Sequence, residues 1–329
     1  MTTKMITVYL TPKPGSSTFE PTFSSDTLFG AIATAGALLE YKIEEWLNDE
    51  NLRISNAFPF CAEKNENKEK KTHYFPVPAL TIDDERPDNL ELFLKIKRVN
   101  KIKWIPENEF LEILSSGNIK EFYQKNLKKE LDDIKNVSFN TSRMIPRNTV
   151  NRLSLEVEEG FYAKTEYFFK DGWGLFFMVR ASDRILEQVK ASIYLLQDRG
   201  IGGDISTGRG AFNIEINENS PPIDFSQITL QKSVILSLYY PQERELEYIK
   251  SKSSYYTIVP RKGFLSVPGV RRVFKRRVVS LGAGSVIDTL PENLIGDCPI
   301  VAPKDKTGLG YDVIFFGRPF IIPMGGKNE

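Results

Sequence analysis

Apolar and polar residues alternate along this chain in two distinct rhythms. Residues 5–12 alternate with a period of two, which predicts a strand with Ile6, Val8 and Leu10 on one face. Residues 27–47, capped by Ser24-Ser25-Asp26, and residues 183–199 carry apolar side chains every three to four positions, which predicts two amphipathic helices. Further strands are expected at 54–60, 153–158, 164–169, 174–180, 212–216, 233–240, 255–260, 270–281 and 313–322, with a short helix near 243–250.

Two segments interrupt the alternation. Residues 63–72 are charged and of low complexity, so we expect a disordered loop over about 61–74. The pattern at 106–133 indicates one or two inserted helices, and residues 143–152, polar and basic around Pro146, indicate a projecting hairpin with a basic tip. We therefore expect a helical insertion and hairpin over about 100–152.

The order of these elements favours an α+β chain. A polar segment with Pro221-Pro222 is the best linker, and it divides the chain into units at 1–220 and 223–329. Strand, helix and strand pair follow one another in both units, which predicts two ferredoxin-like (RRM-like) domains, the second shorter and less regular.

Composition narrows the functional classes. The 329 residues have a net charge of only +1, so a binding site for nucleic acid must be a local basic patch. Cys61 and Cys298 lie far apart without metal spacing, which fits a reducing cytoplasm and leaves no zinc cluster. We expect no leader, no membrane span and no cofactor. His73 is the only histidine and is expected in the charged loop, which argues against histidine-based catalysis.

A glycine-rich run at residues 200–210 is the most informative motif. Glycine allows positive φ and close backbone approach, and successive N–H groups in such a turn form a concavity for anions. The run has no Walker lysine and lies between a helix and a strand, the reverse of a dinucleotide fingerprint. A ligand with several phosphates fits better, although a flexible turn is the plain alternative. The candidate contacts are Gly200, Gly202, Gly203, Ser206, Thr207, Gly208, Arg209 and Gly210.

Two further segments are basic. On a continuous strand, residues 271–277 would place cations on both faces, which suits either a strand lining an RNA groove or an edge strand protected by charge. The hairpin candidates are equally consistent with a solvated loop. Paired carboxylates such as Asp83-Asp84 show no spacing for acid–base work. The candidates are Arg143, Arg147, Asn148, Asn151, Arg152, Arg261, Lys262, Arg271, Arg272, Lys275, Arg276 and Arg277, with Gly284 and Ser285 in a second small-residue turn.

The order in which several short motifs follow one another along the chain is informative. They are residues 25–31 (SDTLFGA), 55–60 (SNAFPF), 148–152 (NTVNR), 160–162 (GFY), 166–169 (EYFF), 208–210 (GRG), 282–285 (GAGS) and 316–320 (FGRPF). In this order they resemble the RAMP superfamily of CRISPR proteins, and within it subunit four of the type III-A (Csm) interference complex.

The resemblance implies a non-catalytic subunit at one end of a crRNA-guided complex. It implies that this subunit grips the 5′ tag of the crRNA, contacts the large polymerase-type subunit and abuts the first backbone RAMP subunit. It also implies a thumb-like hairpin that interrupts pairing between guide and target RNA, for which residues 143–152 are the candidate. Ser25 joins the expected RNA contacts on the same basis.

Two other functions remain open from the residues alone. A metal-independent endoribonuclease that trims precursor crRNA would need tyrosine or lysine to act, because His73 is poorly placed. An enzyme that binds a phosphorylated metabolite at the glycine run is a third reading, although the run is long for one phosphate.

Overall fold

The computed structural model describes residues 3–65, 68–80, 89–150, 157–218, 221–225, 228, 231–265, 273–307 and 310–325. Its main feature is an antiparallel sheet with the order β5-β4-β3-β8-β1-β9, in which β2 also pairs with β8. The strands are β1 (Thr3–Pro12), β2 (Arg53–Ile54), β3 (Phe58–Asn65), β4 (Lys68–Pro76), β5 (Trp104–Pro106), β8 (Trp173–Ser182) and β9 (Phe212–Asn217).

Two helices cover one face of this sheet. Helix α1 (Ser25–Leu38) follows β1, and α6 (Asp183–Arg199) follows β8, so the central elements of the first half come in the order β1, α1, β3, β8, α6 and β9, with further elements inserted between them. Alternate residues of β1 point to these helices, where Ile6, Val8 and Leu10 join a core with both. The α+β prediction for this half is confirmed, and α6 begins and ends at the predicted residues.

The first helix is shorter than expected. Residues 27–47 are not one helix, because α1 ends at Leu38 and a separate α2 (Ile43–Asn48) follows. Glu40 lies between them with φ +62°, a left-handed conformation that breaks helical hydrogen bonding. The turn folds α2 back so that Trp46 packs against Gly36 of α1, where an added Cβ would lie 2.5 Å from the indole.

The charged segment at 63–72 is not a disordered loop as predicted. It forms the β3–β4 hairpin, with Cys61 opposite Thr72 and Lys64 opposite Glu69. His73 therefore lies on β4 and is buried rather than in a loop.

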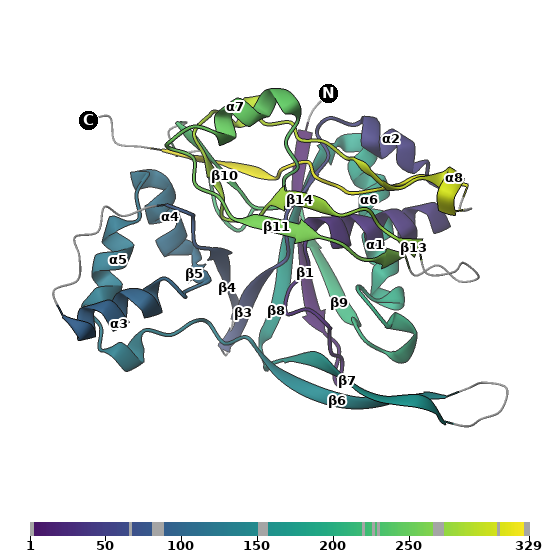
Figure 1. Cartoon of the computed structure of the whole chain (residues 1–329), viewed down its shortest axis with the longest axis horizontal. Coiled ribbons are helices and arrows are strands. Elements are labelled where there is room, and N and C mark those ends of the chain that lie inside the picture. Colours follow the sequence, from purple (N-terminus) through teal and green to yellow (C-terminus); the bar gives the residue numbers. More distant parts are fainter. Residues whose placement is uncertain are drawn as a thin grey trace.

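A helical insertion covers part of the opposite face of the sheet, at the left of Figure 1. The pattern predicted α4 (Glu107–Ser116) and α5 (Lys120–Leu127) but missed α3 (Leu90–Val99), whose apolar residues are partly exposed. Phe110 of α4 stacks on Phe75 of β4 with ring centroids 4.6 Å apart. A short 3-10 turn, η1 (Leu131–Asp133), ends the insertion.

The predicted projecting hairpin is present and longer than expected. Strands β6 (Asn140–Val150) and β7 (Val157–Phe169) pair as a two-stranded ribbon that extends away from the body (Figure 1). Arg143 and Arg147 therefore lie within β6 rather than at a tip. The predicted Asn151 and Arg152, and most of the strand expected at 153–158, lie outside the described residues.

The second half is built from short strands instead of a repeat of the first sheet. The long strands predicted at 233–240, 270–281 and 313–322 are wrong in extent. In particular, Lys275–Arg277 separate the short strands β13 (Val273–Phe274) and β14 (Val278–Leu281), so these cations do not alternate along one strand. The described strands form a sheet of β10 (Lys232–Ile235), β15 (Val286–Ile287) and β18 (Ile321–Met324), and the pairs β11 (Ile258–Arg261) with β14 (Val278–Leu281), β12 (Phe264–Leu265) with β13 (Val273–Phe274), and β16 (Ile300–Ala302) with β17 (Val313–Ile314).

The helices of this half are single turns. They are η3 (Glu243–Glu245), α7 (Leu246–Ile249), η4 (Pro291–Asn293) and α8 (Lys304–Thr307). Together with the insertion, the second half buries the aromatic face of the first sheet. Tyr9, Phe58 and Phe176 share one core with Phe110 of the insertion and Phe320 of the second half.

The packing of the insertion can be tested with two phenylalanines. Phe110→Ala removes a fully buried ring and should lower the free energy of unfolding by about 3–5 kcal/mol. Phe93→Ala, on exposed α3, should change it by less than about 1 kcal/mol. Urea unfolding measures both, and equal losses would contradict this packing.

Candidate nucleic-acid interface

Residues 16–26, which lead from β1 into the first turn of α1, touch three of the elements singled out by sequence. This segment meets the glycine-rich loop through Ser16 and Ser17, since the Ala211 amide donates to Ser16 Oγ at 2.9 Å and the Gly210 amide donates to the Ser17 carbonyl at 2.8 Å. It meets the hairpin through Thr18, which exchanges two backbone hydrogen bonds with Tyr167. The loop and the hairpin are thus held side by side.

The glycine-rich loop is a closed, ordered turn. The Ile201 amide donates to the Gly210 carbonyl at 2.8 Å, which joins the two ends of the loop. Gly210 has φ +65°, and an added Cβ would lie 1.9 Å from the Ile201 carbonyl oxygen, so only glycine fits there. Positive φ angles also occur at Gly200, Gly202, Asp204 and Gly208.

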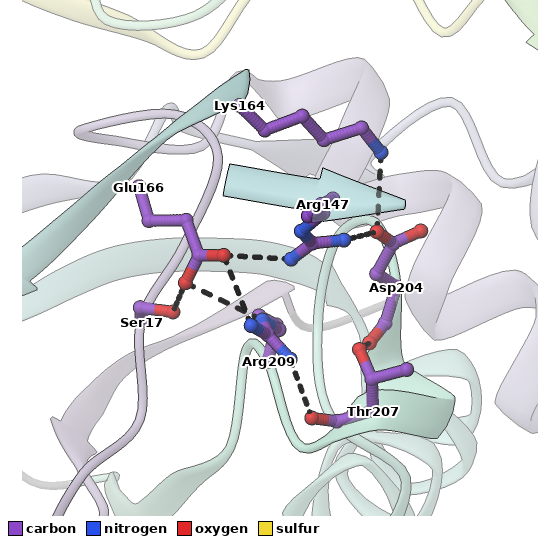
Figure 2. A network of polar contacts seen from close by, with 7 residues as sticks. All are labelled: Ser17, Arg147, Lys164, Glu166, Asp204, Thr207 and Arg209. Atoms are coloured by element: carbon purple, nitrogen blue, oxygen red, sulfur yellow. Dashed lines mark hydrogen bonds and ion pairs between the residues drawn. The ribbon is translucent and has the colours of Figure 1, made fainter. Parts of the chain in front are cut away.

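A buried carboxylate, Glu166 of β7, joins the loop to the hairpin (Figure 2). It accepts a hydrogen bond from Ser17 Oγ at 2.5 Å and ion pairs from Arg147 Nη2 at 2.6 Å and Arg209 Nη2 at 3.0 Å. Burial by itself would raise the pKa of Glu166, but the bonds from Ser17, Arg209 and Arg147 outweigh it and lower the pKa to about 2. The network is therefore ionised at neutral pH.

A second carboxylate, Asp204, lies on the loop itself. Its Oδ2 is 2.6 Å from Arg147 Nη1 and 3.1 Å from Lys164 Nζ (Figure 2). Both cations also face the ring of Phe19, with Arg147 Cζ 5.2 Å and Lys164 Nζ 4.7 Å from its centroid. Arg147 thus bridges the two carboxylates.

Arg209 holds the loop in shape in this structure. Besides Glu166, it donates through Nη1 to the carbonyl of Thr207 at 2.9 Å, and the Thr207 hydroxyl donates to the carbonyl of Asp204 at 2.8 Å. These contacts leave two guanidinium N–H groups and the exposed backbone of Gly202 and Gly203 for a ligand, whereas the Gly208 amide donates to the Ile205 carbonyl at 3.1 Å. The side chain of Ser206 lies outside the described residues.

A pocket of about 200 Å³ opens where the loop meets the hairpin. It is lined by Gly15, Ser17, Ile145, Glu166, Phe168, Thr207, Gly208 and Arg209. Arg143 lies just beyond, exposed, with Cζ 5.2 Å from the Phe168 ring centroid. The aromatic, hydroxyl and guanidinium groups that line this pocket suit a nucleotide.

Two of the basic residues of the second half, Arg261 and Lys275, lie at the start of α1. Arg261 forms ion pairs with Asp26, at 3.2 Å from Nε to Oδ2, and donates to Thr27 Oγ1. Lys275 lies nearby, where burial lowers its pKa, Asp26 opposes that shift and Arg261 adds to it. Lys262, Arg276 and Arg277 are exposed and form no ion pair with other described residues. Segment 16–26 therefore reaches the basic patch as well.

Three predicted contacts are occupied within the protein. Ser25 is fully buried, and its Oγ accepts the Leu238 amide at 3.0 Å, because it joins the two halves of the chain. Ser285 is fully buried and donates to the Gly282 carbonyl at 2.6 Å. Gly284 packs on Val77, whose carbonyl would lie 2.8 Å from an added Cβ. The predictions that these residues contact RNA are at odds with their burial.

The remaining candidates are placed in two groups. Asn148 lies exposed on β6, at the bulge beyond Arg147. Asn151, Arg152, Arg271 and Arg272 lie outside the described residues. Sequence reasoning missed Ser17, Phe19, Lys164, Glu166 and Asp204 as site residues. The one available signal was a single glutamate inside the aromatic run 166–169, which a buried partner would explain.

The lone histidine lies away from this interface. His73 Nε2 is 2.9 Å from Tyr9 Oη, and Nδ1 is 2.6 Å from Glu107 Oε2, which links β4 to the first turn of α4. Burial and the charges of Glu215 and Glu107 raise the pKa of Tyr9 to about 12. Within the described ranges, no group of three metal-ligating side chains converges, and no helix is long and apolar enough to cross a membrane.

The chain is similar to known CRISPR proteins along its whole length. Residues 229–324 match the family model of the CRISPR Csm4 C-terminal domain. The protein described as "CRISPR system Cms protein Csm4" from Thermococcus onnurineus is 24% identical over 337 residues, which covers 98% of this chain and 96% of that protein. Its namesake from Methanocaldococcus jannaschii is 22% identical over 289 residues, covering 79% and 73%.

Solved structures share the fold. A chain of a Csm3–Csm4 subcomplex in the type III-A CRISPR-Cas interference complex aligns with a TM-score of 0.60 at 18% identity, covering 97% of this chain and 99% of that one. A chain of a Csm1–Csm4 cassette in complex with pppApA aligns with a TM-score of 0.59 at 21% identity, covering 99% and 100%. The sequence and structural matches together support a likeness to the RAMP proteins of the type III CRISPR systems. More particularly the chain is Csm4-like, which confirms the resemblance drawn from its motifs.

The buried carboxylate gives this interface a defined acid sensitivity. Because the pKa of Glu166 is about 2 against an ordinary 4.5, its ionisation contributes stability that is present above about pH 4.5 and lost as the pH falls toward 2. Glu166→Gln should therefore be less stable than the wild type at pH 7 and lose less stability across that window. Urea unfolding at several pH values measures this difference.

A matched exposed carboxylate serves as the control. Glu215 pairs with Lys71 at 2.7 Å, but its side chain is 63% exposed, so Glu215→Gln should follow the wild-type pH profile. Parallel profiles for wild type and Glu166→Gln would show that the network does not stabilise the fold.

Proposed function

We propose that this chain is the crRNA-binding subunit of a type III-A CRISPR complex. It holds the 5′ tag of the crRNA and bridges the large polymerase-type subunit to the backbone filament. The observation that carries this proposal is that segment 16–26 joins the glycine-rich loop, the cationic side of the hairpin and Arg261 of the basic patch. These three elements come from distant parts of the sequence.

The chemistry of this surface favours a phosphate chain over a single phosphate. The loop offers exposed backbone at Gly202 and Gly203, and the basic patch offers Lys262, Arg276 and Arg277. Backbone N–H groups and guanidinium groups are the usual partners of RNA phosphates. The uncharged Phe168 beside the pocket offers a surface for a base.

The burial of the aromatic face of the first sheet supports the same location for the RNA. An RRM-like domain commonly stacks bases on the aromatic residues of its open sheet face. We propose a ferredoxin-like arrangement for the first unit, supported by its strand order β3-β8-β1-β9. Its aromatic face is buried under the insertion and the second half, so RNA has the loop and hairpin edge instead.

The proposed protein partners rest on the structural relatives. One relative was solved with Csm3 and another with Csm1, and each aligns over nearly the whole of this chain. We assign the corresponding partners to this chain, with target RNA approached only through the complex. The hairpin that projects from the body is the proposed thumb between guide and target.

RNA binding can be measured by fluorescence anisotropy with a 5′ tag oligonucleotide and a scrambled control across a salt series. The wild type should prefer the tag and bind less tightly as salt rises. Arg276→Ala should weaken binding to both RNAs and lower the log–log salt slope by about one. Arg184→Ala is the matched control, because this exposed arginine of α6 pairs with Glu45 away from the interface. A wild-type salt slope in Arg276→Ala would contradict the role of the basic patch.

We also propose that the subunit has no catalytic role. The buried position of His73 between Tyr9 and Glu107 supports this, because RNA cannot reach the imidazole without opening the core. Incubation of the pure protein with repeat RNA in EDTA should leave the RNA intact. Cleavage at one position that is lost in Tyr9→Phe or His73→Ala would support the endoribonuclease alternative.

A further inference from the structure

The two carboxylates of the interface differ in how they are held. The side chain of Glu166 is 2% exposed, comes from a strand and binds three partners. The side chain of Asp204 is 36% exposed and comes from a loop with glycines on both sides. Glu166 therefore belongs to the framework, whereas Asp204 lies at the surface of the site.

The cations beside Asp204 require an anion. Arg147 and Lys164 both approach its Oδ2, at 2.6 Å and 3.1 Å, and both lie over the one ring of Phe19. Glu166 already faces two cations, Arg147 and Arg209, so the charge of Lys164 is left for an anion at the position of Asp204 to compensate. In this structure that anion is a carboxylate oxygen, and the oxygen of a phosphodiester has the same charge and accepts the same hydrogen bonds.

The backbone of Asp204 suggests that the carboxylate is held in place by this contact. Asp204 has φ +54°, a left-handed conformation that residues other than glycine adopt infrequently. Its side chain is 36% exposed, while the Thr207 hydroxyl donates to its backbone carbonyl at 2.8 Å. Rotation about the Cα–Cβ bond can therefore move the carboxylate away without breaking the contacts of Glu166 or those of the loop backbone.

We propose that Arg147 and Lys164 form a phosphodiester site, which Asp204 occupies in the free chain and leaves when RNA binds. Asp204 acts there as an internal mimic of the phosphate. The inference rests on the proposed function for the identity of the phosphate, an RNA backbone, but the site itself is defined by its own contacts. Occupation by Asp204 weakens binding of stray anions and of short RNAs that cannot displace it.

The inference predicts that removing a site residue tightens binding. Asp204→Asn removes the competing charge, and asparagine tolerates a left-handed backbone at least as well as aspartate. The variant should bind tag RNA and inorganic tripolyphosphate about tenfold more tightly than the wild type, with a salt slope steeper by about one. Adding Lys164→Ala to Asp204→Asn should remove most of the gain.

Two controls separate this effect from a change in net charge or in loop order. Asp132→Asn makes the same chemical change in the insertion, where the Asp132 side chain is 93% exposed and its Oδ1 lies 3.0 Å from Arg98 Nη1. This variant should leave the affinities for tag RNA and for tripolyphosphate unchanged. Asp204→Gly retains the positive φ and also removes the charge, so it should behave like Asp204→Asn.

The two ligands distinguish the possible failures. Equal or weaker tripolyphosphate binding by Asp204→Asn overturns the inference, whatever happens with RNA. Tighter tripolyphosphate binding without RNA binding by any variant upholds the phosphate site and counts against the proposed function. Equal gains in Asp132→Asn would show that net charge alone is responsible, which also overturns the inference.

Discussion

The interface depends on one buried carboxylate. Glu166 is ionised inside the protein because Ser17 and two arginines satisfy its oxygens, and each of these partners comes from a different element. A buried charge with such partners is costly to disturb, since removing any partner leaves the others unsatisfied. The hairpin, the segment after β1 and the glycine-rich loop are therefore fixed relative to one another. The backbone of the surface that they share has a defined shape before any ligand arrives, which reduces the entropy lost on binding and leaves only the Asp204 side chain to move.

The packing of the main sheet explains why the interface lies at one end of that sheet and not on either of its faces. One face of the sheet is closed by α1 and α6, and the aromatic face is closed by the insertion and the second half of the chain. His73 contributes to that closure by joining Tyr9 of β1 to Glu107 of α4. What remains is the end of the sheet where β1 leads to segment 16–26 and α6 leads to the glycine-rich loop. A long ligand can follow this edge from the hairpin to Arg261 without opening either core.

Periodicity predicted the elements whose environment is uniform, and missed those set by distant contacts. Helix α6 has one buried stripe along its length, so its bounds were correct. The break at Glu40 and the β3–β4 hairpin depend on packing that no local pattern reveals. For the site, glycine spacing located the loop and the arginines located the hairpin. The partner of Arg209 was not predictable, because Glu166 is 43 residues away in the chain. The burial of Ser25 likewise follows from a contact between the two halves, and that of Ser285 from contacts within the second half.

The central claim is that RNA lies along the edge formed by the glycine-rich loop and the hairpin. Hydrogen–deuterium exchange of this protein, measured with and without 5′ tag RNA, tests it most directly. The account predicts slower exchange in residues 200–210, in segment 16–26 and on the paired parts of β6 and β7. It also predicts unchanged exchange in α3, α4 and α5. Protection confined to the insertion, or to the exposed surfaces of α1 and α6, would contradict the account.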